Sequence, residues 1–218
     1  MIRPAQYLAD LLYPRKCLLC EKLLGKDETD LCHRCRTEAE SFSGTKKEIP
    51  FVAGWTALWY YEGTVRDSLL RYKFSNHRSY AETYGRFLAM KLSEEGLSFD
   101  LLTWVPVSRR RKWKRGYDQD YLIAAALGKE LGIRPIAVLR KIRNNRPQSG
   151  MQSASARRAN VLGVYRPVHP EMLTGKRILL IDDIITTGAT VSECARVLLT
   201  AGAAEVTCAA VAAGKQRK

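Results

Sequence analysis

The sequence predicts an α/β fold, in which a parallel sheet is flanked by helices and a small cysteine-rich module precedes it. Apolar runs suited to buried strands alternate with segments of helical spacing from about Val52 onward. Four of the six cysteines fall within nineteen residues near the N-terminus. Strands that alternate with helices imply a parallel sheet with helices on both faces. We therefore expect residues 1–45 to form the small module and residues 50–218 to form the α/β domain.

The elements of this domain follow from hydrophobic periodicity and from turn signals. Short apolar runs predict buried strands, and apolar residues three and four apart predict helices. Thr64 is a plausible N-cap for the first helix, and Gly202 ends the last one. The expected strands are 52–61, 100–107, 136–140, 177–184 and 205–211, and the later helices are 79–92, 120–131 and 192–200.

The N-terminal cysteines follow the pattern of a four-thiolate metal site. Cys17-x2-Cys20 and Cys32-x2-Cys35 are separated by eleven residues. Each C-x2-C turn can direct two sulfurs to one point, and two such turns complete the tetrahedron that Zn²⁺ prefers. A module of about 30 residues has too little core to fold unaided, so we expect structural zinc on these four cysteines. An iron–sulfur cluster, a redox pair, and replacement of one ligand by His33 are the alternatives.

The chain is strongly basic. It has 36 Lys and Arg against 22 Asp and Glu, a net charge of +14 and a sequence pI near 9.7. Such an excess suits a polyanionic partner, either nucleic acid or a substrate with several phosphates; a basic solvated surface without a partner is the alternative. No run approaches about 18 apolar residues, so no membrane span is expected. Residues 1–12 do not read as a secretory signal, which makes disulfides unattractive and a cytoplasmic location the default expectation.

The segment ILLIDDIITTGAT, from Ile178 to Thr190, is predicted to bind a phosphorylated sugar. In open α/β sheets ligands bind beyond the carboxyl ends of strands, where Asp182 and Asp183 are expected to accept hydrogen bonds from ribose hydroxyls. The next turn precedes a helix, whose N–H groups and dipole favour an anion. The expected phosphate-binding residues are Thr186, Thr187, Gly188, Ala189 and Thr190. A plain strand–turn–helix connection is the alternative, and it would leave two adjacent carboxylates to repel each other.

This segment resembles the signature of type I phosphoribosyltransferases, in which an apolar strand, two acidic residues and a Thr-Thr-Gly turn bind phosphoribosyl pyrophosphate. By this resemblance Asp182 and Asp183 form the catalytic pair on the ribose 2- and 3-hydroxyls, and residues 186–190 hold the 5-phosphate. The resemblance also implies Mg²⁺, bound largely by the substrate's own oxygens. The motifs of P-loop NTPases and of dinucleotide-binding folds are missing from the sequence.

A basic stretch follows the expected strand at 100–107. Six cations lie within the seven residues from Arg109 to Arg115. Because that strand should neighbour the phosphate loop, Arg109 and Arg115 are expected to reach the pyrophosphate from a mobile loop and to stabilise its developing charge. A solvated loop, or a contact with single-stranded nucleic acid in which Trp113 stacks on bases, is also compatible with the sequence. A second basic stretch, 139–160, is polar and is expected to end in a helix.

Three further short motifs lie between the cysteine cluster and the phosphate loop. They are Val105-Pro106-Val107 with Arg115-Gly116-Tyr117-Asp118-Gln119, Arg146-Pro147-Gln148-Ser149-Gly150, and Arg157-Arg158-Ala159-Asn160. With the cysteine cluster and the phosphate loop, their order and spacing resemble the ComF family of competence proteins over nearly the full chain. The family more often has Asn where this chain has Asp118, which leaves the role of that position open.

The resemblance implies a type I phosphoribosyltransferase-like fold with a zinc-ribbon-like module. It further implies that the chain binds phosphoribosyl pyrophosphate and acts in natural transformation and the uptake of single-stranded DNA, beside a separate helicase-like ATPase. Transfer of the pentosyl group to an unknown acceptor, as by a glycosyltransferase, is one expectation. The alternatives are a non-catalytic DNA-processing adaptor that uses the phosphoribosyl site for structure or sensing, and a nucleotide-salvage phosphoribosyltransferase.

Overall fold

A four-stranded parallel sheet forms the centre of the computed structural model, which describes residues 14–43, 47–143 and 159–215. The strand order is β1 (Gly54–Tyr60), β6 (Glu205–Ala213), β5 (Arg177–Ile185) and β2 (Leu101–Trp104). Most of the second basic stretch lies outside the described residues, together with its motifs at 146–150 and 157–158. All three strand pairs of this sheet are parallel, so the sheet predicted from the alternation of strands and helices is confirmed.

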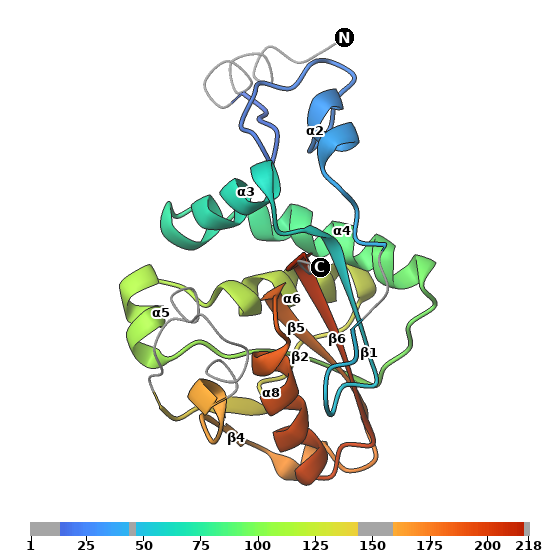
Figure 1. Cartoon of the computed structure of the whole chain (residues 1–218), viewed down its shortest axis with the longest axis vertical. Coiled ribbons are helices and arrows are strands. Elements are labelled where there is room, and N and C mark those ends of the chain that lie inside the picture. The colour runs from blue at the N-terminus through green and yellow to red at the C-terminus, as the bar shows by residue number, and fades with distance from the viewer. Residues whose placement is uncertain (1–13, 44–46, 144–158, 216–218) are drawn as a thin grey trace.

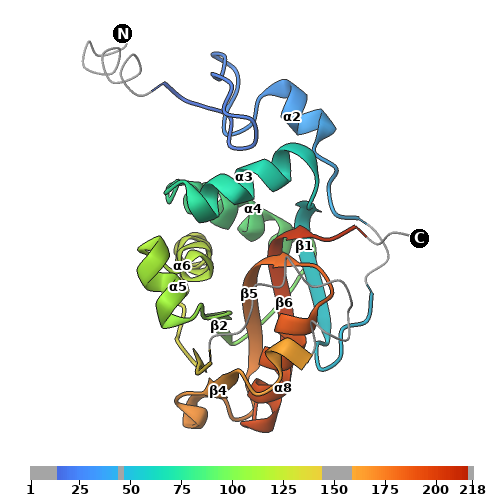
Figure 2. The same cartoon turned by 60° about the vertical axis from the view of Figure 1, so that its left-hand side comes forward.

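Side chains of the central strand β5 alternate between two hydrophobic clusters, one on each face of the sheet. Leu179 and Ile181 pack toward α3 (Gly63–Phe74), α4 (Tyr80–Glu94) and α6 (Gln119–Leu131). Ile178 and Leu180 pack toward α8 (Ala189–Thr200). Figure 2 shows α6 and α8 on opposite sides of β5. The alternation extends to the next two residues of β5, Asp182 and Asp183, because successive side chains of a strand point to opposite faces. It reverses after them, since Ile184 packs on the side of α3, α4 and α6 and Ile185 on the side of α8.

The remaining short elements lie around this sheet. A two-stranded antiparallel ribbon of β3 (Leu139–Lys141) and β4 (Tyr165–Pro167) belongs to the α8 side. The 3₁₀ turn η2 (Pro170–Met172) leads from this ribbon into β5. Within the described ranges, no helix is both long enough and apolar enough to cross a membrane.

Several boundaries differ from those expected. The first helix begins at Gly63 with Glu62 as its N-cap, so Thr64 lies inside it. The last helix begins at Ala189 rather than 192, because the Thr-rich turn passes directly into its first turn. Strand β5 ends at Ile185, one residue later than expected, and the acidic pair lies in its last part, as the expected strand 177–184 also had it.

The cysteine module lies against α3 and α4 at one end of the molecule (Figures 1 and 2). Its buried residues belong to the same hydrophobic cluster as those two helices. The Ser68 hydroxyl on α3 donates to the Leu18 carbonyl at 2.6 Å, and the Arg71 guanidinium donates to the Leu19 carbonyl. The module therefore shares a core with the α/β domain, while the boundary at residues 45–50 stays a prediction.

Candidate functional site

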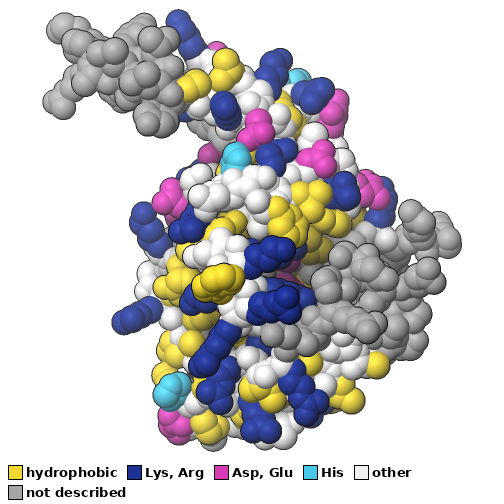
Figure 3. Space-filling model, turned by 90° about the vertical axis from the view of Figure 1, so that its left-hand side faces the viewer, with side chains coloured by type: hydrophobic (Ala, Val, Ile, Leu, Met, Phe, Trp, Pro, Cys, Tyr) yellow, Lys and Arg dark blue, Asp and Glu magenta, His cyan; other side chains and the backbone are white. Residues whose placement is uncertain are grey.

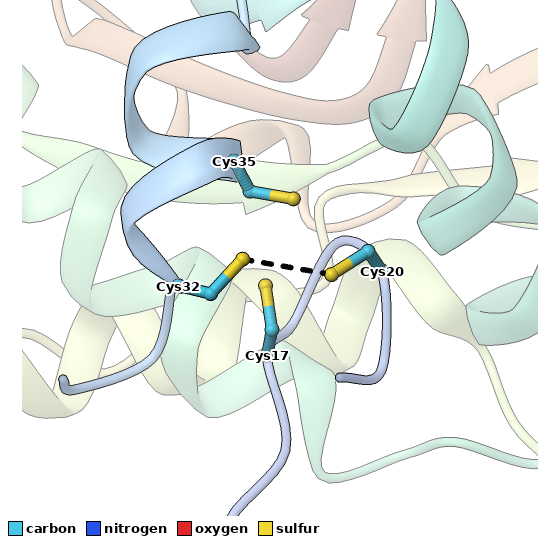
Figure 4. A group of neighbouring side chains, drawn as sticks. All are labelled: Cys17, Cys20, Cys32 and Cys35. Atoms are coloured by element: carbon cyan, nitrogen blue, oxygen red, sulfur yellow. Dashed lines mark hydrogen bonds between the residues drawn. The ribbon is translucent and has the colours of Figure 1, made fainter. Parts of the chain in front are cut away.

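The four cysteines of the N-terminal module converge on one point. Cys17, Cys32 and Cys35 are buried and Cys20 is partly buried. Their sulfurs lie within 4.8 Å of one another, and those of Cys20 and Cys32 are 3.6 Å apart (Figure 4). Tetrahedral Zn²⁺ with bonds of about 2.3 Å requires sulfurs about 3.8 Å apart. All four thiols are free of disulfides, and the cluster fits structural zinc.

The local backbone explains this convergence. A turn between Cys17 and Glu21 is closed by the Glu21 N–H, which donates to the Cys17 carbonyl at 2.9 Å. Cys32 is the N-cap of α2 (His33–Glu38), which carries Cys35 one turn later. His33 begins this helix, is exposed and is not part of the sulfur cluster. The four cysteines predicted from sequence are therefore placed to bind one metal ion together, and His33 is not.

The phosphate loop lies where β5 passes into α8. Thr186 is exposed, Thr187 and Thr190 are half-buried, and Ala189 is buried at the start of the helix. A small pocket at this turn is lined by Asp182, Ile184, Ile185, Thr186, Gly188, Ala189, Thr190 and Val191. The structure thus brings all of the expected phosphate-binding residues except Thr187 into one pocket with Asp182, at the N-terminus of a twelve-residue helix, where an anion is favoured.

Gly188 is required by the geometry of this turn. Its φ of +77° lies in the left-handed region, where residues with a side chain are strained. A Cβ at this position would also meet Ile49 Cδ1 at 2.8 Å. The turn can therefore reach its observed shape only with glycine.

Asp182 and Asp183 are both buried, with 8% and 5% of their surfaces exposed. Alternation along β5 turns Asp183 toward α3 and α6 and Asp182 toward α8. Even so, both carboxylates offer an oxygen within 4.8 Å of a third carboxylate, that of Asp120 on α6. The acidic pair predicted from sequence is thus part of a buried triad.

The carboxylate of Asp183 has two polar partners on the α3 and α6 side. The ammonium of Lys73 on α3 forms an ion pair with Asp183 Oδ2 at 2.9 Å. The side-chain amide of Gln119, at the start of α6, donates to the same oxygen at 3.2 Å. Burial lowers the pKa of Lys73, but the Asp183 carboxylate outweighs it and raises this pKa above its usual value. The lysine therefore stays protonated beside the acidic pair.

The carboxyls of Asp182 and Asp120 both have raised pKa values, so their charged forms are disfavoured. Burial, followed by the charge of Asp183, raises the pKa of Asp182 to about 7. The same two causes raise the pKa of Asp120 well above its usual value. Perturbed carboxyls of this kind gather at functional sites, where their charge becomes favourable once a ligand supplies hydroxyl groups or a cation.

A basic group lies on the Asp182 side of the sheet end. Burial, followed by the neighbouring charge of Arg111, lowers the pKa of Lys141 on β3 to about 8. Burial also lowers the pKa of Arg111 itself. Lys141 lies 3.3 Å from the hydroxyl of buried Tyr165 on β4. The charge of Asp182 acts on Lys141 and that of Asp183 acts on Arg111, so both cations lie near the acidic pair. Such a combination suits a ligand that carries both phosphate and hydroxyl groups.

The basic stretch at 109–115 forms a helix, α5 (Arg109–Arg115), and not the mobile loop that was expected. Ser108 caps its N-terminus by accepting from the Arg111 N–H at 3.3 Å, and Gly116 ends it with a φ of +78°. Arg109 is exposed, while the Arg115 guanidinium lies 5.0 Å from the centre of the Phe74 ring. The roles expected for Arg109 and Arg115 stay predictions.

The surface around the acidic residues is basic. Figure 3 shows Lys and Arg side chains gathered on one face around a hollow in which acidic side-chain atoms are visible. Trp113 on α5 is 88% exposed, the most exposed large hydrophobic side chain among the described residues. This combination of surface cations and an exposed indole is typical of surfaces that bind single-stranded nucleic acid.

Asp118, where the ComF family more often has Asn, is the N-cap of α6. Its carboxylate accepts from the Tyr121 N–H at 3.2 Å and from the Val107 N–H at 3.4 Å. Because Asn also serves as an N-cap, this position has a structural role that either residue fills.

Sequence reasoning missed Lys73, Asp120 and Lys141 as site residues. Lys73 follows Val65 by eight residues and Leu69 by four, so it occupies the buried face of α3. A lysine on the buried face of a helix is unusual, and this was the signal in the sequence that could have identified Lys73 as a site residue. Lys141 alternates with exposed Arg140 in β3, but three residues are too few to show a pattern.

Comparisons with known proteins agree with this arrangement. The family described as "Phosphoribosyl transferase domain" matches residues 121–218, and the "Double zinc ribbon domain" family matches residues 8–46. The fold is therefore that of a phosphoribosyltransferase, with a four-cysteine module, as the sequence predicted.

Three relatives are similar over nearly their whole lengths. The chain is 30% identical to the DNA utilization protein YhgH of Escherichia coli O157:H7 over 204 residues, which cover 87% of this chain and 86% of that one. It is 24% identical to competence protein F of Haemophilus influenzae over 215 residues, with 88% and 93% covered. It is 28% identical to competence protein ComFC of Streptococcus pneumoniae over 225 residues, with 88% and 96% covered. The chain belongs to the family of these proteins, the ComF family.

Proposed function

We propose that this protein binds phosphoribosyl pyrophosphate together with Mg²⁺ at the end of β5, and that it handles single-stranded DNA during natural transformation. The observation that carries the proposal is the junction of a buried acidic pair with a Thr-Gly turn at the start of α8. A 5-phosphate would lie against the turn at 186–190, where N–H groups and hydroxyls favour an anion. Asp182 and Asp183 would accept hydrogen bonds from the two ribose hydroxyls.

The cations around the acidic pair complete the ligand site. Arg111 and Lys141 are better placed for the pyrophosphate than exposed Arg109, because partial burial strengthens their attraction for an anion. Arg109 and Arg115 would contribute from the outer side of α5. Mg²⁺ supplies charge neutralisation of the pyrophosphate when it is bound, and the carboxylate oxygens at the end of β5 are the ligand type that it prefers.

Turnover needs more than binding. In the enzymatic form of the proposal, pyrophosphate leaves C1 of the ribose, an acceptor attacks that carbon, and buried carboxylates offset positive charge on the ring. In the non-catalytic form, the same site senses phosphoribosyl pyrophosphate and leaves it intact. A nucleotide-salvage role is the third form, in which the acceptor is a free base.

The DNA component is supported by α5 and by the relatives. Surface cations with an exposed Trp113 fit base stacking and backbone contact. Relatives named for competence and for DNA utilization support a role in DNA uptake. The proposal includes a separate helicase-like ATPase as partner and a cytoplasmic site of action.

One set of measurements separates these forms. Binding of phosphoribosyl pyrophosphate is measured by calorimetry, and pyrophosphate release by a coupled assay, for the wild type and for Asp182→Asn/Asp183→Asn. Transformation efficiency is measured in cells that carry the same variants. Asp67→Asn is the matched control, because it removes an exposed carboxylate of α3 that pairs with Arg66 at 3.7 Å.

Each outcome has a distinct meaning. Binding with release of pyrophosphate, lost in the double variant, supports the enzyme. Binding without release, with transformation lost in the double variant, supports the sensing role. Release that depends on an added purine or pyrimidine base supports salvage. A wild type that does not bind phosphoribosyl pyrophosphate at millimolar concentration refutes the site.

A further inference from the structure

Helix α3 lies between the cysteine module and the acidic residues at the end of β5 (Figures 1 and 2). Its last turn carries Arg71, Tyr72 and Lys73 in succession. Each residue of an α-helix is turned by about 100° from the one before it, so Arg71 and Lys73 project from nearly opposite sides of α3. Their contacts agree with this geometry, since Arg71 reaches the module and Lys73 reaches Asp183.

On the module side, α3 holds the turn between the first two cysteines. The Arg71 guanidinium donates to the Leu19 carbonyl, and the Ser68 hydroxyl donates to the Leu18 carbonyl at 2.6 Å. Both carbonyls belong to the two residues inside the first C-x2-C pair. A bound zinc ion holds such a turn in one conformation because two of its ligands flank the turn, so the position of both carbonyls depends on the metal.

On the other side, α3 contacts the acidic residues and the start of α6. The Tyr72 hydroxyl donates to the Gln119 carbonyl at 2.7 Å, and Lys73 Nζ lies 2.9 Å from Asp183 Oδ2. The side chain of Lys73 is 16% exposed and that of Asp183 is 7% exposed. A buried carboxylate that loses its partner is left with an uncompensated charge, so Asp183 depends on the position of Lys73.

The two sets of contacts lie close together on one helix. Ser68 and Lys73 are separated by about 7.5 Å along the axis of α3, since each residue of a helix rises about 1.5 Å. The buried residues between them, Leu69 and Tyr72, belong to the hydrophobic cluster that also contains the buried cysteines of the module. A helical segment of this length moves as one body, so α3 passes a shift of the zinc-binding turn on to Lys73.

We propose that the cysteine module holds Lys73 in contact with Asp183, and that it acts through α3. Ser68 and Arg71 are the positioning residues of this link. Without zinc, or without the Arg71 contact, Lys73 leaves Asp183 and the sugar-phosphate site loses affinity. The step from Lys73 to ligand affinity rests on the proposed function, whereas the step from zinc to Lys73 does not.

Chemical labelling of lysines measures the link in the absence of a sugar phosphate. The full-length protein is treated with N-hydroxysuccinimide acetate, and acetylation of each lysine is followed by mass spectrometry. Lys73 should react slowly in the zinc-loaded wild type. After a chelator removes the zinc, it should react faster by on the order of 10-fold, the size of a typical coupling between two sites. Arg71→Met should give the same increase with zinc still bound. Ser68→Ala should change the rate in the same direction and replaces Arg71→Met if that variant folds poorly.

Two controls separate this link from a general loosening of the fold. Lys141, in the ribbon on the α8 side of the sheet, is the internal reference and should keep its rate. Arg86→Met is the matched variant, because Arg86 also contacts the module, through Asp30 at 2.6 Å, but lies on α4. It should leave the labelling of Lys73 at the wild-type rate.

The labelling rates decide the first step of the proposal. An unchanged rate at Lys73, either in the zinc-free protein or in Arg71→Met, would overturn the link. An equal rise at Lys73 and Lys141 would also overturn it, because the whole fold would then have loosened. So would a rise in Arg86→Met that matches the rise in Arg71→Met, since α3 would then have no special role.

Calorimetry with phosphoribosyl pyrophosphate and Mg²⁺ tests the consequence for the site. Arg71→Met should weaken binding by on the order of 10-fold, and Arg86→Met should bind as the wild type does. A wild type that does not bind refutes the proposed function and leaves the labelling result valid. Wild-type affinity in Arg71→Met, together with faster labelling of Lys73, would overturn the step from Lys73 to the ligand.

Discussion

Replacement of Asp182 by Asn should make the ligand-free protein more stable, although it removes a residue of the proposed site. Burial, and next the Asp183 carboxylate, raise the pKa of Asp182 from its usual 3.8 to about 7. A pKa that is higher in the folded than in the unfolded protein means that stability falls as the pH rises between the two values. Because the carboxyl ionises first in the unfolded chain, the raised pKa costs stability progressively from about pH 3.8 to about pH 7, and the full cost remains above pH 7.

The size of the effect follows from the same two values. Each pH unit in this window is worth about 1.4 kcal/mol. The ionisable Asp182 therefore lowers the free energy of unfolding by about 4 kcal/mol at pH 8 and by about 2 kcal/mol at pH 5.5. Asn retains the acceptor for the Asp183 N–H, which now donates to Asp182 Oδ1 at 2.9 Å. We expect Asp182→Asn to gain about 2–4 kcal/mol at pH 8 and clearly less at pH 5.5.

Urea unfolding followed by tryptophan fluorescence measures this difference in buffer without divalent cations other than bound zinc. The zinc site is common to both proteins, so its own pH dependence cancels in the difference. Asp67→Asn, an exposed carboxylate on α3, should change stability by less than about 0.5 kcal/mol. A variant at Asp182 that is less stable than the wild type at pH 8, or a gain that is the same at both pH values, would refute the reasoning.

Four further outcomes can be checked with standard assays. Gly188→Ala should lower the free energy of unfolding in urea by about 1–2 kcal/mol, because φ is +77° and the new Cβ meets Ile49. An unchanged free energy would contradict the conclusion that this turn requires glycine. Lys73→Met should lower the free energy of unfolding in urea by about 3 kcal/mol at pH 8, because the buried Asp183 carboxylate loses its 2.9 Å ion pair. An unchanged value would contradict this role of Lys73. Trp113→Ala should weaken binding to a fluorescent oligo(dT) by about 1–3 kcal/mol without altering the Tm, because the exposed indole can no longer stack on a base. Equal fluorescence anisotropy curves for the wild type and the variant would show that Trp113 does not contact the DNA. Metal analysis should find about one zinc per chain, and a chelator should lower the Tm, because the sulfur cluster packs on α3.

The order of elements could be predicted from sequence because local patterns encode it. Apolar runs such as Ile178 to Ile181 are too short for helices and are bounded by turn residues, so they specify buried strands. The C-x2-C pairs specify a metal cluster because few other arrangements use four thiols at that spacing. The ends of elements were less certain, since helix α8 begins three residues earlier than the periodicity indicated.

The sequence alone determined the parallel α/β fold, the four-cysteine cluster and the Thr-Gly turn after the acidic pair, because each is written in residues close together in the chain. Only the tertiary structure brought Lys73 from α3 and Asp120 with Gln119 from α6 to the end of β5. Gln119 and Asp120 are adjacent in the chain, but Lys73 precedes them by at least 46 positions. Gln119 is in turn 64 positions from Asp183. The contacts depend on how two helices pack on one face of the sheet, which no local pattern specifies. Whether an acidic pair is solvated or buried with a third carboxylate is decided by that packing.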